Sequence, residues 1–160
     1  MEYSHSVRDM WKAYLTSLGE DPATTRKTFT AWHFSDNRAD AVSLAALVKA
    51  GTKSATSSPY GMYEHDQEPL PITGDHSVIT DWDGEAQCIV RNTSVEIVPF
   101  NQVTAEFAQA EGEGDRSMAY WQRVHWAAFS RELHAIDRSP TEVMLVVCET
   151  FEVVHPIPGR

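Results

Sequence analysis

Gly51-Thr52-Lys53-Ser54-Ala55-Thr56-Ser57-Ser58 is the stretch at which the chain changes from helical to strand-like sequence. Before it, apolar residues at helical spacing predict helices over residues 6–18 and 38–50, with Ser6 as the first N-cap and Gly51 at the second helix end. After it, a composition rich in Ser, Thr, Pro, Gly and acidic residues predicts a long loop over residues 52–75. The stretch therefore separates a helical first part from a strand-rich remainder.

The strand-rich remainder predicts the fold class. Segments rich in β-branched residues predict antiparallel strands over residues 76–82, 85–93 and 95–100, and a last, central strand over residues 141–155. Two further helices are expected over residues 103–110 and 117–133. Because the strands are grouped rather than alternating with helices, the sequence predicts an α+β fold with a small antiparallel β-barrel or sheet flanked by helices.

Length and composition indicate one acidic globular domain. The chain has 160 residues and a formal net charge of -10. Its longest apolar run, Val143–Cys148, is far shorter than the roughly 18 residues that a membrane span needs. The first residues lack the features of a secretory signal. Cys88 and Cys148 lie in apolar segments, which favours buried thiols in a cytoplasmic protein, with one disulfide as the alternative.

The acidic charge is concentrated in the middle of the chain. Residues 55–115 hold 1 basic and 12 acidic side chains. Proteins that bind duplex DNA carry a basic stripe, because counterion release provides most of their non-specific affinity. The sequence therefore predicts no duplex DNA partner, and its short apolar runs predict no membrane partner. A basic face assembled from distant arginines and lysines would weaken this argument; the candidates are Arg38, Lys49, Arg116 and Arg123.

Lys53 is the first candidate for chemistry, and two roles are open to it. A lysine acts as a base or nucleophile when burial lowers its pKa toward neutrality. The C-terminal end of the preceding helix acts in the opposite direction, because it favours the charged form, which suits binding of an anion or a carbonyl group. A third, structural interpretation is a solvated lysine in a Ser/Thr turn.

The second candidate is the acidic segment Glu111-Gly112-Glu113-Gly114-Asp115. An acid placed in a pocket here would have a raised pKa and act as a general acid. The spacing does not fit the calcium-loop signature, and no histidine pair has zinc-site spacing, so no metal and no cofactor are expected. A polar loop that leads into a helix is the structural alternative. His125, beside Trp121 and Phe129 on the following helix, is expected to be ordered and partly buried.

Four stretches and the closing strand resemble the ASCH domain family, a PUA-like β-barrel family. The stretches are Trp32-His33-Phe34-Ser35-Asp36, Gly51 to Thr56, Pro99-Phe100 with Val103, and Phe107 through the acidic segment to Trp121 and His125. The closing strand is Val147 to Val154. The resemblance implies a single domain over residues 1–160, with an N-terminal helical extension over residues 1–30 and a core over about residues 31–156, as in the longer bacterial form.

The resemblance also implies a site. The family signature reads roughly G-x-K-x-x-T-x-R, and Gly51, Lys53 and Thr56 match it, whereas Ser58 stands in place of the final arginine. Serine cannot form the bidentate contact that arginine makes with a phosphate. Some small bacterial members remove the acetyl group from N4-acetylcytidine with a lysine, a threonine and a glutamate. These three roles fall on Lys53, Thr56 and Glu111 as catalytic residues.

Three functions follow as hypotheses. The first is hydrolysis of a modified nucleoside, in which Thr56 attacks the acyl carbon, neutral Lys53 takes its proton and Glu111 protonates the leaving amine, or in which Lys53 and Glu111 activate a water. The second is a module that binds single-stranded RNA or nucleotides without catalysis, and the third is a metal-independent ribonuclease. The substrate-binding residues expected with these functions are Gly51, Ser57, Ser58, Tyr60 and Trp32.

Overall fold

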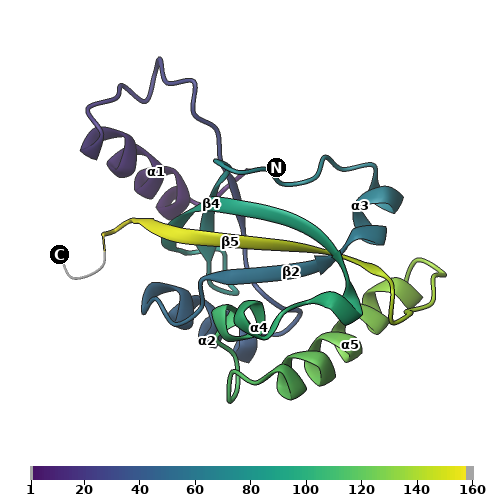
Figure 1. Cartoon of the computed structure of the whole chain (residues 1–160). Coiled ribbons are helices and arrows are strands. Elements are labelled where there is room, and N and C mark those ends of the chain that lie inside the picture. The colour runs from purple at the N-terminus through teal and green to yellow at the C-terminus, as the bar shows by residue number, and fades with distance from the viewer. Residues whose placement is uncertain (1, 158–160) are drawn as a thin grey trace. The chain divides into compact units, whose positions relative to one another are not determined.

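The computed structural model describes residues 2–157 and contains helices and one sheet (Figure 1). The helices are α1 (His5–Ser17), α2 (Arg38–Lys49), α3 (Tyr60–Asp66), the 3-10 turn η1 (Phe100–Gln102), α4 (Ala105–Glu111) and α5 (Met118–His134). The strands are β1 (Thr30–Trp32), β2 (Ala55–Pro59), β3 (His76–Thr80), β4 (Ala86–Pro99) and β5 (Leu145–His155). None of the described helices is long and apolar enough to cross a membrane.

The strands form one sheet in the order β1-β3-β4-β5-β2. β3 pairs antiparallel with β4, and β2 pairs antiparallel with β5, with Ser57 opposite Cys148. β1 pairs parallel with β3, with Ala31 opposite Val78, so the sheet is mixed rather than wholly antiparallel. The predicted α+β class, a small sheet flanked by helices, is confirmed.

The chain divides into two compact units, and β4 and β5 run through both. Among the described residues, unit 1 comprises residues 2–52, 74–92 and 151–157, and unit 2 comprises residues 53–73 and 93–150. Each unit has its own buried cluster of apolar side chains. Cys88 in unit 1 and Cys148 in unit 2 are free and buried, and burial raises the pKa of each thiol to about 12. The interpretation as buried thiols is therefore confirmed.

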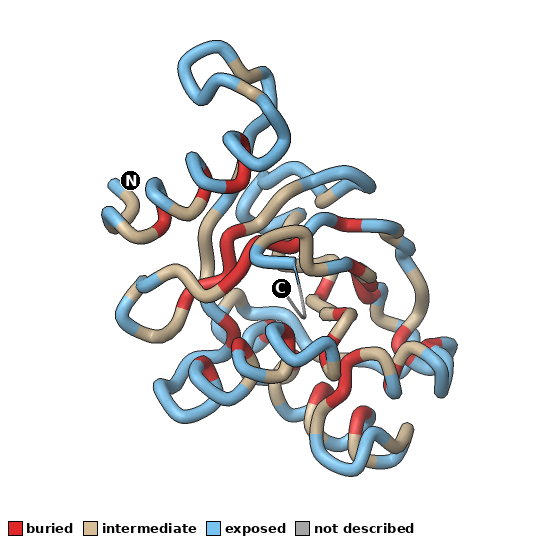
Figure 2. Tube along the Cα trace, turned by 90° about the vertical axis from the view of Figure 1, so that its left-hand side faces the viewer, coloured by how far each residue is buried: buried red, intermediate tan, exposed pale blue. Residues whose placement is uncertain are grey.

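In unit 1 the helices α1 and α2 pack on opposite faces of β3. Successive side chains of a strand point to opposite faces, so Val78 and Ile79 meet different neighbours. Val78 packs with Trp11 and Leu15 of α1, and Ile79 packs with Val48 of α2. Along the helices, buried positions recur between exposed ones, as an amphipathic helix requires (Figure 2). The N-terminal helix therefore contributes to the core of this unit.

In unit 2 the buried cluster joins α5 to β5. It contains aromatic and small side chains, namely Phe100, Val103, Ala108, Trp121, Phe129, Val146 and Cys148. Phe100 lies 5.3 Å from Trp121 between ring centroids. Helices α4 and α5 pack against β2 at the edge of the sheet (Figure 1). This packing brings the ends of α4 and β2 and the inner face of α5 together.

Three local predictions were wrong. The N-cap of α1 is Ser4, which accepts the N–H of Val7 at 3.3 Å, because Ser6 instead accepts the N–H of Ala86 at 2.9 Å. Residues 52–75 are not one loop but contain β2 and α3. β2 is polar and lacks an apolar alternation, and its pairing with β5 makes it a strand. The two strands expected over residues 85–100 are one continuous strand, β4.

We expect Leu15→Ala to destabilise the protein far more than Leu18→Ala. Leu15 is fully buried against β3, whereas Leu18 is 48% exposed. Truncating a buried leucine costs about 3 kcal/mol, and truncating an exposed one costs little. Urea unfolding of both variants measures the difference. Equal stabilities would contradict the packing of α1 into unit 1.

Candidate functional site

Lys53, the first residue of unit 2, lies four residues after the last residue of α2. Gly51 adopts φ +80°, a left-handed conformation that glycine accepts without strain, and the N–H of Thr52 returns to the carbonyl of Leu47 at 3.0 Å. The prediction that Gly51 ends this helix is confirmed. The Lys53 side chain then lies buried, with the residue 2% exposed.

The end of α4 brings in the glutamate. Thr104 caps the start of this helix by accepting the N–H of Phe107, and Gly112 ends it at φ +71°. Glu111 is the last helical residue and is 1% exposed. The N–H of Ser54 donates to the carbonyl of Ala110 at 2.7 Å, so backbone fixes Lys53 beside Glu111.

Lys53 forms ion pairs with two glutamates. Its Nζ lies 3.1 Å from Glu111 Oε1 and 2.8 Å from Glu113 Oε2, and it also donates to the carbonyl oxygen of Glu111 at 3.4 Å. A cation at the C-terminal end of a helix is favoured by the exposed carbonyl groups there. The solvated lysine of the structural interpretation is therefore wrong.

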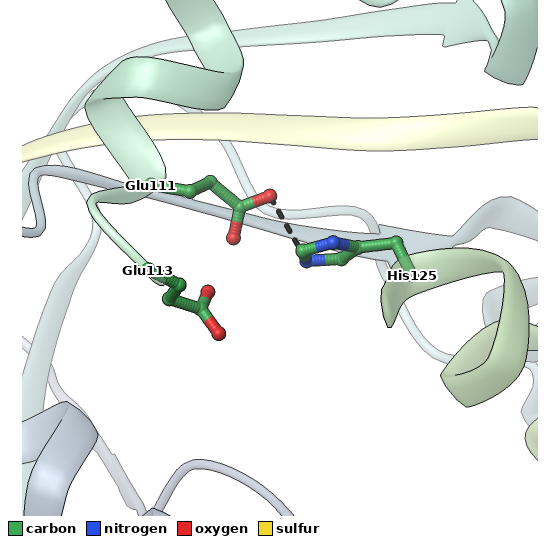
Figure 3. A group of neighbouring side chains, drawn as sticks. All are labelled: Glu111, Glu113 and His125. Atoms are coloured by element: carbon green, nitrogen blue, oxygen red, sulfur yellow. Dashed lines mark ion pairs between the residues drawn. The ribbon is translucent and has the colours of Figure 1, made fainter. Parts of the chain in front are cut away.

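The other carboxylate oxygen of Glu111 meets three further side chains. Ser57 Oγ donates to Glu111 Oε2 at 2.6 Å, and Trp121 Nε1 donates to it at 2.5 Å. His125 Nε2 lies 3.3 Å from the same oxygen (Figure 3). Within residues 2–157 no buried side-chain nitrogen or oxygen lacks a hydrogen-bond partner. Lys53, Ser57, Glu111, Glu113, Trp121 and His125 are called the Lys53 cluster below.

Opposite charges in this cluster shift the pKa of each partner toward its charged form. Burial on its own would lower the pKa of Lys53, but Glu111 and Glu113 together outweigh it and raise that pKa. Burial would likewise raise the pKa of Glu111, yet Lys53, His125 and Ser57 hold it well below the ordinary value. Lys53 is therefore an ammonium ion and Glu111 a carboxylate, and of the two roles open to Lys53 the charged one fits.

Glu111, Glu113 and His125 are residue types that bind metals, and one ligand atom from each lies within 4.8 Å of the others (Figure 3). Asp115 does not belong to this group. The Lys53 ammonium already pairs with both carboxylates at 3.1 and 2.8 Å, so a metal ion entering here would meet a fixed positive charge. We assign no metal to this group.

Of the other residues predicted at the site, Ser57 is the one that contacts Glu111. Ser57 contacts Glu111, whereas Thr56, the neighbouring residue on β2, faces the opposite side of the strand. Ser58 pairs with Tyr63, with 3.1 Å between Oγ and Oη. Tyr60 begins α3 and is half-buried.

Trp32 belongs to unit 1, where it packs edge-on against Phe34 with ring centroids 4.8 Å apart. The structure therefore brings Lys53, Ser57 and Glu111 together, and among the described residues the Thr56 side chain makes no hydrogen bond to the cluster.

Sequence reasoning did not assign Glu113, Trp121 or His125 to the site. Glu113 was part of the acidic segment, and the two aromatic residues stand four apart, the spacing that places side chains on one face of a helix. Gly114 shapes the same loop at φ +58°, and a Cβ there would lie 2.4 Å from the Tyr120 ring. Only glycine fits this position without moving Tyr120.

A separate open groove of about 610 Å³ lies elsewhere in unit 2 and includes none of the Lys53 cluster. It is lined by Phe100, Asn101, Ala119, Gln122, Arg123, Trp126 and Glu142. It therefore adds no group to the buried ion pairs.

Comparisons with known proteins identify the family. The domain model of the ASCH family matches residues 30–155. A crystal structure of an ASCH domain from Lactobacillus crispatus is 35% identical, with a TM-score of 0.87, and the match covers 96% of this chain and 97% of that one. Protein EF3133 from Enterococcus faecalis is 33% identical, with a TM-score of 0.81, over 92% of this chain and 87% of that one.

A more distant match shows the fold alone. The hypothetical protein PH0355 is 16% identical, with a TM-score of 0.52, over 79% of this chain and 99% of that one. No curated protein matches the chain. The chain belongs to the ASCH domain family, as its motifs predicted, and shares the PUA-like fold, which is a fold of RNA-binding proteins.

We expect Glu111→Gln to destabilise the protein and to reduce its loss of stability in acid. Removing one partner of a buried ion pair costs about 3 to 5 kcal/mol. Because the pKa of Glu111 is lowered on folding, its contribution to stability is present above its unfolded pKa and is lost as the pH falls toward its folded pKa. Urea unfolding between pH 7 and pH 3 measures both effects.

Glu64→Gln is the matched control, because Glu64 pairs with Arg138 at 3.2 Å on the surface. An exposed pair contributes less than about 1 kcal/mol. Equal losses in the two variants would contradict a buried, ionised Glu111.

Proposed function

We propose that this protein is a hydrolase that acts on a modified nucleoside, with release of acetate from N4-acetylcytidine as the leading reaction. The observation that carries the proposal is a lysine ammonium beside an ionised, buried glutamate, with Nζ 3.1 Å from Glu111 Oε1. In amide hydrolysis a fixed positive charge can stabilise the oxyanion and a carboxylate can accept a proton, and the cluster offers both groups. Membership in the ASCH family supports the same proposal.

In the proposed reaction Lys53 acts by its charge. Glu111 accepts a proton from the attacking water or hydroxyl while the new C–O bond forms at the acyl carbon. The ammonium of Lys53 stabilises the negative charge on the carbonyl oxygen. The C–N bond then breaks, and the proton held by Glu111 passes to the leaving amine. This replaces a mechanism in which a neutral lysine is the base, because the two glutamates raise the pKa of Lys53.

The attacking group has three candidates. The family signature favours Thr56. The contact of Ser57 Oγ with Glu111 Oε2 at 2.6 Å favours Ser57, because a hydroxyl is activated by an adjacent base. A water molecule bound by Glu111 is the third candidate. A hydroxyl nucleophile predicts an acyl-enzyme, which a water molecule must then hydrolyse to release acetate and restore the hydroxyl. Direct attack by water releases acetate without this intermediate.

The charge of the chain favours a small neutral substrate. With a net charge of -10, and with 12 acidic side chains against 1 basic one in residues 55–115, the chain repels a polyanion more than a nucleoside. Arg38, one of the residues considered for a basic face, is engaged by Asp83 through two contacts of 2.7 and 2.9 Å.

A second candidate function is binding of single-stranded RNA or nucleotides without turnover, and the RNA-binding character of the PUA-like fold favours it. In this case Lys53 holds a phosphate or carbonyl group, and binding weakens as salt increases. Metal-independent cleavage of RNA is a third candidate, and Lys53→Ala purified in the same way controls for contaminating nucleases.

Release of cytidine from N4-acetylcytidine tests the leading proposal. We expect turnover by the wild type and a loss of about 100-fold or more in Lys53→Ala, because a preorganised charge beside a developing oxyanion contributes about that much. Lys12→Ala, at an exposed position of α1, is the matched control and should retain full activity. Circular dichroism of each variant verifies folding.

The variants Thr56→Ala and Ser57→Ala distinguish the attacking groups in the same assay. Loss in one variant, together with an acyl adduct found by mass spectrometry in the wild type, assigns the nucleophile. Retained turnover in both assigns attack by water. No turnover by the folded wild type, together with salt-sensitive binding of single-stranded RNA, would replace the hydrolase proposal by the second candidate.

A further inference from the structure

The ring of His125 is fixed by its neighbours on α5. It stacks on the Trp121 indole with ring centroids 4.5 Å apart and an angle of 14° between the planes. Phe129, one turn further along, meets it edge-on at 5.5 Å. The residue is 8% exposed. The two ring nitrogens therefore point in fixed directions.

Both nitrogens of His125 face oxygen atoms that only accept hydrogen bonds. Nδ1 lies 2.9 Å from the carbonyl oxygen of Trp121, and Nε2 lies 3.3 Å from Glu111 Oε2. A neutral imidazole has one N–H and one lone pair. Either neutral tautomer would therefore direct a lone pair at an oxygen. The doubly protonated ring satisfies both contacts.

Protonation of Glu111 instead of His125 does not fit the same contacts. The carboxylate of Glu111 receives donors from Lys53, Ser57 and Trp121, at 3.1, 2.6 and 2.5 Å. An ionised carboxylate only accepts hydrogen bonds, so these donors match it, and a proton on it would compete with them. The His125 contact with Glu111 Oε2 at 3.3 Å therefore fits an Nε2–H that faces an ionised carboxylate.

The charges around His125 balance when its ring is positive. The titratable groups that face the ring and Glu111 are Glu113 in the loop after α4, Lys53 before β2 and Cys148 on β5. Burial raises the pKa of Cys148 to about 12, so that thiol is neutral. Two cations, Lys53 and His125, then match two anions, Glu111 and Glu113. With a neutral His125, a single ammonium, that of Lys53, would face the two carboxylates of Glu111 and Glu113.

We propose that His125 is a positioning residue that keeps both ring protons and holds the Glu111 carboxylate in its place beside the Lys53 ammonium. Its effect on turnover rests on the proposed function, whereas its charge state does not. Burial would lower the pKa of His125, but its hydrogen bond to Glu111 and the charges of Glu111 and Glu113 raise it. The stabilising contribution of His125 is therefore complete below its unfolded pKa and is lost as the pH rises through its folded pKa.

Histidine ring nitrogen NMR on the full chain tests the charge state without reference to activity. The His125 signals are those that His125→Asn removes. We expect both ring nitrogens of His125 to have imidazolium shifts at pH 7.5, where free histidine in the same buffer is mostly neutral. A neutral tautomer of His125 at pH 7.5 would overturn the proposal, whatever the activity of the protein.

Two substitutions separate positioning from packing. The amide nitrogen of glutamine takes approximately the place of Nε2, so His125→Gln keeps a donor to Glu111 that does not titrate. The amide nitrogen of asparagine takes the place of Nδ1, so His125→Asn keeps only the contact to Trp121. We expect the glutamine variant to stay within about 3-fold of wild-type turnover and the asparagine variant to lose about 10-fold.

The pH profiles complete this comparison. Wild-type turnover and stability should both fall as the pH rises through the pKa of His125, and the glutamine variant should lack this fall in both. If the protein has no turnover, the proposed function is wrong, and the dependence of stability on pH still tests the role of His125. The positioning role would be overturned if both variants lost turnover equally and if turnover and stability still fell at high pH as in the wild type.

Discussion

Burial of the Lys53 ammonium is the constraint on which the arrangement of unit 2 depends. A buried charge without a partner costs several kcal/mol, so the fold must bring carboxylates to it. Glu111 lies at the end of α4, Glu113 follows the helix-ending Gly112, and β2 begins at Ala55, two residues after the lysine. The backbone contact between Ser54 and Ala110 at 2.7 Å holds these segments together. Removing the charge of Lys53 or of Glu111 leaves the other charge buried. The two residues therefore contribute to stability as a pair.

The same constraint limits the chemistry that we propose for the cluster. Two glutamates raise the pKa of Lys53, so this residue acts as a permanent positive charge rather than as a base. Glu111 is the group left to accept a proton, and its other oxygen receives Ser57 and Trp121 at 2.6 and 2.5 Å. A carboxylate held by so many donors is well oriented, and the same donors make it a weaker base than a free carboxylate.

Local patterns predicted the parts of the fold that are set locally. The helix over residues 38–50 and its end at Gly51 follow from apolar spacing and a left-handed glycine, and the motif around Lys53 placed the chain in its family. β2 was not predicted because Thr56, Ser57 and Ser58 do not alternate between apolar and polar residues. Its pairing with β5 makes this segment a strand. The contact of His125 with Glu111 was not predicted for the same reason, since Glu111 lies on another helix.

The central claim is that Lys53 is a buried cation, and NMR of its side-chain amine tests it most directly. Lysine labelled with ¹⁵N and ¹³C gives the Nζ and Cε shifts of each residue, and comparison with Lys53→Met assigns the signal. The account predicts that the Lys53 ammonium remains charged at a pH above 10.5, the ordinary pKa of lysine, because Glu111 and Glu113 face it. A Lys53 amine that loses its proton near neutral pH would contradict the account and restore the neutral base.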